Sequence, residues 1–220
     1  MKTACAYVLL RGGSKGIKSK NIVDLGGKPL CFYALDALDA VSEIERIVVS
    51  TDSGLIRDVV IGHPSKKIEL INRPVELASD GASSDDALAH AMGVIPSDFY
   101  VFVQATSPLL RSETIGAALE MAIQNNQKVM TAYRTHSFIW SANGVLPLVL
   151  DHIAHRPNRQ EFDGVCIENG ACYSGPTDDF LRTGSRIGEN MGVVEMHQQE
   201  SLEIDSMADL EWASRVLNAS

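Results

Sequence analysis

Strand-like and helix-like stretches alternate along most of this chain, and the alternation limits the folds that it can adopt. Apolar or β-branched runs, typical of buried strands, occupy 4–10, 46–50, 67–71, 99–103 and 128–133, with shorter runs near 170–173, 192–196 and 202–205. Apolar residues at helical spacing predict helices at 29–41, 54–60, 84–95, 112–124 and 207–217. Because such alternation buries a sheet between helices, we predict an α/β protein with a mostly parallel sheet covered on both faces.

Polar residues at the predicted helix starts support these assignments. Asp52 or Ser53 can cap the helix at 54–60, and Ser112 is expected to cap the helix at 112–124. Ser206 and Asp209 form a capping-box-like pair before the last helix.

Three loops are expected to meet at one edge of this sheet. In parallel sheets, ligands bind at the carboxyl ends of the strands. The loops that follow the first, third and fourth predicted strands are 11–21, 73–84 and 104–111. We therefore expect a single site there, built from segments that lie far apart in the sequence.

The loop at 11–21 combines glycines with positive charge in an otherwise acidic chain. Its glycines are Gly12, Gly13 and Gly16, and its cations are Arg11, Lys15, Lys18 and Lys20. Glycines let backbone N–H groups approach an anion closely, and the cations can neutralise phosphates. The spacing fits neither the Walker loop nor the dinucleotide loop. The sequence thus favours a phosphate site of another kind, with a solvated surface turn as the alternative.

A second candidate feature is the acid pair Glu203 and Asp205. On a strand, these side chains point to one face and Ile204 to the other. Magnesium is typically held by one or two protein carboxylates together with substrate phosphate oxygens. Two solvated acids, with Asp205 assisting the helix start, remain an equally supported interpretation of the pattern.

Composition restricts the partners and the compartment. The net charge is −9 over 220 residues, and no basic face of the kind that binds nucleic acid is visible. No apolar stretch reaches the roughly 20 residues that cross a bilayer. The four cysteines show neither zinc nor redox spacing, so we expect free thiols and a cytoplasmic protein. We predict a single domain over 1–220. The alternation of strands and helices fails at 136–168, which we expect to be either an arm that reaches another subunit or a surface excursion.

These motifs together resemble the CMP-sialic acid synthetases, also called acylneuraminate cytidylyltransferases. The resemblance rests on RGGSKGI at 11–17 with Lys20 and Asn21, on RP at 73–74 with ELASD at 76–80 and SS at 83–84, and on QATSP at 104–108. It continues with RQ at 159–160, DG at 163–164, ENG at 168–170, Tyr173 and EID at 203–205. The stretch from 134 to 141 looks closer to the animal-type catalytic domain than to some bacterial relatives.

The resemblance implies a three-layer, Rossmann-like nucleotidyltransferase with a dimerisation insertion. Its activity would be transfer of CMP from CTP to the anomeric hydroxyl of N-acetylneuraminate, or of a related nine-carbon α-keto acid sugar, with release of pyrophosphate. It also implies Mg²⁺ as cofactor, with Mn²⁺ able to substitute, and a homodimer in which Arg159 serves the partner's site. If the source is an animal, the resemblance also allows a nuclear location.

The resemblance assigns roles residue by residue. The catalytic residues are Arg11, Lys15 and Lys20. The nucleotide-binding residues are Arg11, Gly12, Gly13, Ser14, Asn21, Arg73 and Ser84. The sugar-binding residues are Gln104, Arg159, Asn169 and Tyr173, and the metal ligands are Glu203 and Asp205.

Four positions depart from the family pattern: Leu10 in place of Ala, Lys18 in place of Pro, Ile167 in place of Arg and Glu203 in place of Asp. Two alternative hypotheses follow. The first changes the sugar to 3-deoxy-octulosonate or legionaminate. The second is a non-catalytic nucleotide-binding protein with the same fold.

Overall fold

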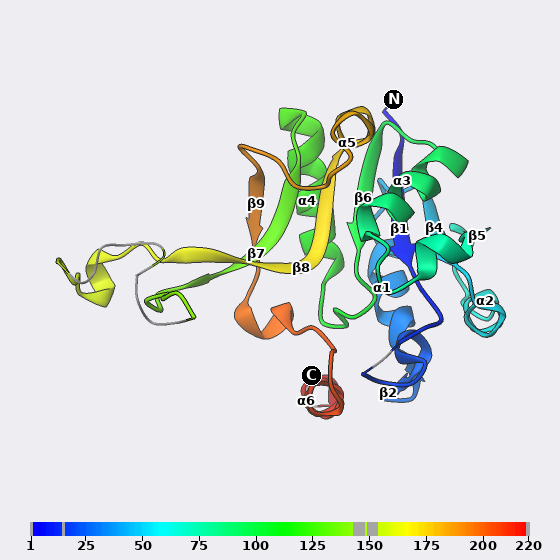
Figure 1. Ribbon diagram of the computed structural model, residues 1–220, viewed down its shortest axis with the longest axis horizontal. Coiled ribbons are helices and arrows are strands. Elements are labelled where there is room, and N and C mark those ends of the chain that lie inside the picture. The colour runs from blue at the N-terminus through cyan, green and yellow to red at the C-terminus, as the bar shows by residue number, and fades with distance from the viewer. Residues whose placement is uncertain (1, 15, 143–147, 149–153, 219–220) are drawn as a thin grey trace.

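The computed structural model describes residues 2–14, 16–142, 148 and 154–218. Within them, one large sheet runs through the molecule (Figure 1). In spatial order its strands are β5 (Ile68–Asn72), β4 (Arg46–Thr51), β1 (Ala4–Leu9), β6 (Phe99–Val103), β8 (Val165–Pro176), β7 (Val129–Thr135) and β9 (Gly192–Glu195). Only the pairings of β8 with β6 and β7 are antiparallel. The predicted α/β fold with a mostly parallel sheet is therefore confirmed.

Helices cover both faces of the sheet, and the side chains of β1 show how. Ala6 and Val8 pack on one face with α1 (Leu30–Asp39), α2 (Gly54–Ile61) and α4 (Ser112–Asn125). Cys5 and Tyr7 point to the other face, toward α3 (Ser84–Val94) and α5 (Thr177–Thr183). Because both faces are apolar, the central strands are apolar throughout, as buried parallel strands are. This gives the three layers that were expected.

A smaller cluster lies beside the sheet. It joins α6 (Met207–Asn218) to the hairpin of β2 (Asp24–Leu25) and β3 (Lys28–Pro29). Ile17 and Ile204 are buried in this cluster with Leu210. The cluster therefore brings the loop at 11–21 next to the segment that precedes α6. Short 3₁₀ turns complete the described elements: η1 (Lys20–Ile22), η2 (Val75–Ala78), η3 (Arg159–Glu161) and η4 (Gln198–Ser201).

Most predicted elements agree with the structure to within one or two residues, and two helix starts behave as expected. The Ser53 hydroxyl accepts from the Ile56 N–H at the start of α2. At the start of α6, the Ser206 N–H donates to Asp209 Oδ2 at 2.7 Å, and the Asp209 N–H donates back to Ser206 Oγ at 3.3 Å. This capping box is confirmed.

Two predictions were wrong, and one strand is longer than predicted. Residues 202–205 are not a strand; they form an extended segment tied to the sheet by the Ile204 N–H, which donates to the Thr106 carbonyl at 2.8 Å. The strand predicted near 170–173 is confirmed, but it is the middle of the longer strand β8, which begins at Val165. Ser112 does not cap α4: the N-cap is Arg111, and the Ser112 hydroxyl donates to Glu113 instead.

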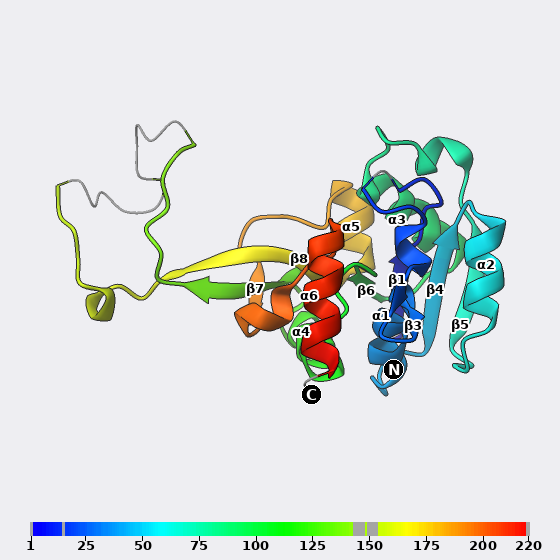
Figure 2. The same cartoon turned by 90° about the horizontal axis from the view of Figure 1, so that it is seen from below.

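The far ends of β7 and β8 form an antiparallel ribbon that leaves the sheet. Thr135 pairs with Val165 there, and both views show the described residues beyond this pair carried away from the main body (Figures 1 and 2). At the tip, the Phe138 and Phe162 rings stack with centroids 5.9 Å apart, and the Arg156 guanidinium lies 4.1 Å from the Phe138 centroid. The predicted arm at 136–168 thus begins where expected but rejoins the sheet at Val165. The parts of it at 143–147 and 149–153 lie outside the described residues.

Two further features bear on the sequence predictions. The four cysteines are free. Across the ranges that the structure describes, no helix is both long enough and apolar enough to cross a membrane.

Candidate active site

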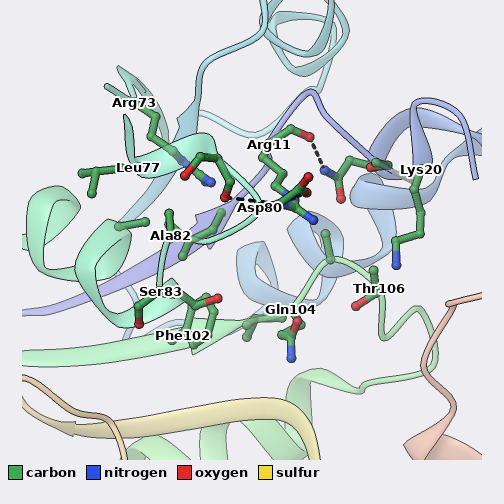
Figure 3. Close-up of a pocket in the computed structure, with 18 of the residues that line it drawn as sticks. Arg11, Lys20, Arg73, Leu77, Asp80, Ala82, Ser83, Phe102, Gln104 and Thr106 are labelled. Atoms are coloured by element: carbon green, nitrogen blue, oxygen red, sulfur yellow. Dashed lines mark hydrogen bonds and ion pairs between the residues drawn. The ribbon is translucent and has the colours of Figure 1, made fainter. Parts of the chain in front are cut away.

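A cavity of about 420 Å³ opens at the carboxyl ends of β1, β5 and β6 (Figure 3). The loops at 11–21, 73–84 and 104–111 all contribute to its lining, which confirms their predicted convergence. The segment before α6 adds Glu203 and Asp205. Figure 3 shows Arg11 and Lys20 on the loop after β1, and Gln104 and Thr106 on the loop after β6. The cavity therefore brings cations, carboxylates and polar side chains together from separate loops.

The glycine-rich loop is fixed at both ends. The Leu10 N–H donates to the Ser50 carbonyl at 2.9 Å, and the buried Asn21 amide donates to the Arg11 carbonyl at 2.9 Å. The Gly12 N–H donates to Asp52 Oδ1 at 2.9 Å, so this amide is already engaged. Arg11, Ser14, Gly16, Lys20 and Asn21 line the cavity. Gly12 and Gly13 are not among the described lining residues, and Lys15 lies outside the described residues.

Gly16 is the position in this loop where a side chain would not fit. A Cβ added there would lie 2.8 Å from the Asp205 carbonyl oxygen. Backbone oxygen cannot yield in the way that the end of a flexible side chain does. Glycine therefore permits the close approach of the loop to the segment that carries the acid pair.

Arg11 and Lys20 are both paired with carboxylates. Arg11 Nη1 lies 3.1 Å from Asp80 Oδ1. Lys20 Nζ donates to Asp205 Oδ1 at 3.0 Å and to the Ile204 carbonyl at 2.9 Å. The Lys20 side chain is only 20 % exposed, because it bridges the loop to the segment before α6. Both cations are thus held beside the cavity by acids that lie 69 and 185 residues away.

Arg73 is a buried cation in the wall of the cavity. Its Nη2 donates to the Ser50 carbonyl at 2.7 Å and its Nε donates to Ser50 Oγ at 3.2 Å. Burial lowers the pKa of Arg73, while the charge of Asp52 raises it and that of Arg11 lowers it further. Arg73 therefore lines the cavity while its hydrogen bonds to Ser50 hold its side chain in place.

The start of α3 also lines the cavity. Ser83 is the N-cap, and its hydroxyl accepts from the Asp85 N–H at 3.0 Å. Ser83 and Ser84, which was predicted to bind the nucleotide, both line the cavity. Polar groups at a helix N-terminus lie in a positive potential, which favours an electronegative ligand group nearby.

Glu203 and Asp205 both face the cavity although their segment is not a strand. The intervening Ile204 is fully buried, so the alternation of an extended chain places the two acids on the same side. Thr106 Oγ1 donates to Glu203 Oε1 at 3.2 Å. Burial raises the pKa of Glu203, and the neighbouring charge of Asp205 raises it further.

This donor set fits a hard divalent cation. Two carboxylates close enough to perturb each other are stabilised by a cation between them, and magnesium needs only one or two protein carboxylates. Within the described part of the chain, no cluster of three or more His, Cys, Asp or Glu residues has the arrangement of a metal site. The remaining ligand positions would therefore belong to substrate oxygens and water.

The predicted sugar-binding residues fall in different surroundings. Gln104 lines the cavity. Asn169 and Tyr173 are not among the described lining residues. Asn169 accepts from Thr131 Oγ1 at 2.7 Å and donates to Ser201 Oγ at 2.9 Å. Arg159 lies in η3, in the arm.

Tyr173 is 2 % exposed. Its hydroxyl donates to Glu168. Burial, with the Glu168 carboxylate as a lesser cause, raises its pKa to about 12. The Tyr173 hydroxyl therefore contacts the Glu168 side chain and not solvent.

Several residues in and around the site had no role in it assigned from the sequence. Leu77, Asp80 and Thr106 lie in the quoted motifs, and with Phe102 they line the cavity. Asp52 supports the glycine-rich loop. A signal did exist for Asp52, because it follows a predicted strand at the same carboxyl edge. The partners of Asp80 and Thr106 lie too far away in sequence for any local pattern to connect them.

A Rossmann-like sheet whose carboxyl edge carries a cationic, glycine-rich loop is typical of nucleotide-binding α/β proteins. The same fold occurs in CMP:2-keto-3-deoxy-manno-octonic acid synthetase complexed with CTP, with a TM-score of 0.76, 15 % identity and 99 % of each chain covered. It also occurs in 4-diphosphocytidyl-2C-methyl-D-erythritol synthase from Anaerococcus prevotii DSM 20548, with a TM-score of 0.73, 15 % identity, and 99 % of this chain and 96 % of that one covered.

The chain belongs to the cytidylyltransferase family, whose model matches residues 5–158. It is 34 % identical to N-acylneuraminate cytidylyltransferase of Oncorhynchus mykiss over 94 % of this chain and 48 % of the relative. It is 28 % identical to N-acylneuraminate cytidylyltransferase of Streptococcus agalactiae serotype III over 95 % of this chain and 52 % of the relative. The chain thus spans about half the length of the curated relatives that it matches.

Proposed function

We propose that this protein transfers CMP from CTP to the anomeric hydroxyl of N-acetylneuraminate, or of a related nonulosonic acid, and releases pyrophosphate. The observation that carries the proposal is the meeting of Arg11, Lys20, Glu203 and Asp205 in one cavity, where a triphosphate needs cations and a metal site. The names of the curated relatives support N-acylneuraminate as the acceptor.

In the proposed reaction, the anomeric oxygen forms a bond to the α-phosphorus of CTP, and the bond to the bridging oxygen of the pyrophosphate breaks. The hydroxyl loses its proton, and negative charge accumulates on the leaving pyrophosphate. Arg11 and Lys20 stabilise this charge, because preorganised cations act most strongly where charge develops. Lys15 belongs to the same proposed set.

The nucleotide is bound by groups that already line the cavity. Asn21, Arg73 and Ser84 lie along the cavity and offer donors to the base and the ribose, while Ser14 faces the phosphates. Gln104 contacts the sugar from the end of β6. Asn169 and Tyr173 belong to the acceptor side by the resemblance, and their present hydrogen bonds would have to be exchanged for contacts with the sugar.

Glu203 and Asp205 would hold Mg²⁺, or Mn²⁺ in its place. The ion, when bound, neutralises phosphate oxygens and orients the triphosphate. Lys20 keeps the Asp205 carboxylate against the glycine-rich loop, and Thr106 orients Glu203 by donating its hydroxyl hydrogen.

We also propose a cytoplasmic homodimer in which the arm crosses to a second copy and brings Arg159 to its cavity. The projection of the β7–β8 ribbon away from the main body supports this proposal (Figure 2). Light scattering on the purified protein measures its mass in solution, and a monomer at micromolar concentration would contradict the dimer.

The decisive experiment is incubation of the protein with CTP, Mg²⁺ and a panel of α-keto acid sugars, with pyrophosphate measured for each. Release with N-acetylneuraminate supports the proposal. Release only with 3-deoxy-octulosonate or legionaminate would change the acceptor. CTP binding without release with any sugar would favour a non-catalytic nucleotide-binding protein.

A further inference from the structure

Asp52 lies behind the glycine-rich loop and outside the cavity lining. It follows the last residue of β4 and precedes Ser53, the N-cap of α2. Its Oδ1 accepts from the Gly12 N–H at 2.9 Å. A Cβ added at Gly12 would lie 3.0 Å from Ser53 Cβ and 3.5 Å from Asp52 Oδ2, so the loop rests closely on this turn.

The contact fixes the loop where it turns toward the cavity. Arg11, which precedes Gly12, lines the cavity, and its carbonyl is held by the Asn21 side chain. Asn21 and Asp52 therefore hold the carbonyl and the N–H of the single peptide bond that joins Arg11 to Gly12. A loop held in this way before a ligand arrives loses less conformational entropy when it binds.

A carboxylate behind a triphosphate site would repel the ligand if its charge were not offset. The charge of Asp52 is offset from three sides. It accepts from the Gly12 amide, it lies at the positive end of α2, and it raises the pKa of the buried Arg73. The carboxylate thus supports a second cavity residue as well as the loop.

We propose that Asp52 is a positioning residue for the nucleotide: it holds the Gly12 amide so that Arg11 is presented to the triphosphate of CTP. The proposal rests on CTP as the nucleotide of the proposed function. The hydrogen bond from the Gly12 amide accounts for most of the proposed effect, and the negative charge of Asp52 contributes less. An uncharged acceptor of the same shape should therefore serve almost as well.

The test compares two substitutions at this position. Asp52→Asn keeps an oxygen that accepts from Gly12, whereas Asp52→Ala removes it. Asp58→Ala is the matched control, because Asp58 is an exposed acid of the adjacent helix α2. The dissociation constant for CTP is measured by calorimetry without acceptor sugar, and thermal melting shows that each variant is folded.

We expect D52A to weaken CTP binding about fivefold, the effect of one modest, solvent-exposed hydrogen bond worth about 1 kcal/mol. D52N and D58A should stay within about twofold of the unsubstituted protein. In turnover, D52A should raise the KM for CTP more than it lowers kcat, because the proposed role of Asp52 is to hold the loop before CTP binds.

Equal CTP affinity in D52A and the unsubstituted protein would overturn the inference. Equal losses in D52N and D52A would also overturn it, because the effect would then come from charge alone. CTP binding without pyrophosphate release would refute the transfer reaction but leave the inference standing. Failure of the unsubstituted protein to bind CTP would overturn both.

Discussion

Lys20→Ala should separate the role of Lys20 in turnover from its role in stability. Lys20 Nζ makes two contacts, one to Asp205 Oδ1 at 3.0 Å and one to the Ile204 carbonyl at 2.9 Å. The Asp205 side chain is 70 % exposed, so the ion pair is worth only about 0.5–1 kcal/mol. The hydrogen bond to the carbonyl adds about 1 kcal/mol. The substitution should therefore cost about 2 kcal/mol of unfolding free energy at most, or a melting temperature lower by about 4–8 °C.

The expected loss of turnover is larger. Removal of one preorganised donor that stabilises developing charge typically costs about 2.7–4 kcal/mol, which is a fall of about 100- to 1,000-fold. Pyrophosphate release with saturating CTP, Mg²⁺ and N-acetylneuraminate gives kcat. Urea unfolding of the same preparation gives the stability.

Lys18→Ala is the control, because Lys18 is an exposed cation of the same loop. It should change turnover by no more than about threefold, the effect of one screened surface charge. Turnover of K20A close to that of the unsubstituted protein would refute the role given to Lys20. An equal fall in K18A would show that the total charge of the loop matters and the position of Lys20 does not.

Three further predictions follow from the structure. Gly16→Ala should reduce turnover at least about tenfold, because its Cβ would meet the Asp205 carbonyl at 2.8 Å, whereas Gly93→Ala, which meets open space, should leave turnover unchanged. Removal of divalent ions with a chelator should stop pyrophosphate release and added Mg²⁺ should restore it; full activity after chelation would contradict the role of the acid pair. Asp179→Ala should cost about 3 kcal/mol of unfolding free energy, because it leaves the buried Lys128 ammonium without the carboxylate 3.0 Å away. Chiefly the Lys128 hydrogen bond lowers the pKa of Asp179, so the stabilisation by Asp179 is complete above its unfolded pKa of about 3.9 and is lost as pH falls through the lower folded pKa. Urea titrations between pH 2 and pH 6 should show this loss, and D179A should lose less stability over the same range.

Helices and strands were predictable wherever the residue pattern of a single segment is enough to identify them. The strand at 99–103 was found at its observed bounds, because a strand buried on both faces is apolar throughout. The helices at 84–95 and 112–124 were placed within a residue, because one face of each packs on the sheet and gives helical spacing. Convergence of three loops followed, because the carboxyl ends of parallel strands meet at one edge.

Other features required the tertiary structure. Residues 202–205 alternate as a strand does, yet no strand forms, because alternation reports on the faces of an extended chain and not on a neighbour beside it. The alternation nevertheless placed Glu203 and Asp205 on one side. The motif around Asn169 and Tyr173 gave no sign that these side chains bond to Ser201 and Glu168.

The sequence by itself determined the α/β class, the edge of the sheet at which the site lies, and the kinds of side chain available there. Only the tertiary structure decided how they pair: Arg11 with Asp80, Lys20 with Asp205 and the Gly12 amide with Asp52. The physical reason is the sequence separation of the residues that interact. Helical and strand periodicity arise from contacts between residues a few positions apart, whereas each of these pairs joins residues at least 40 positions apart, brought together when the sheet and its helices pack.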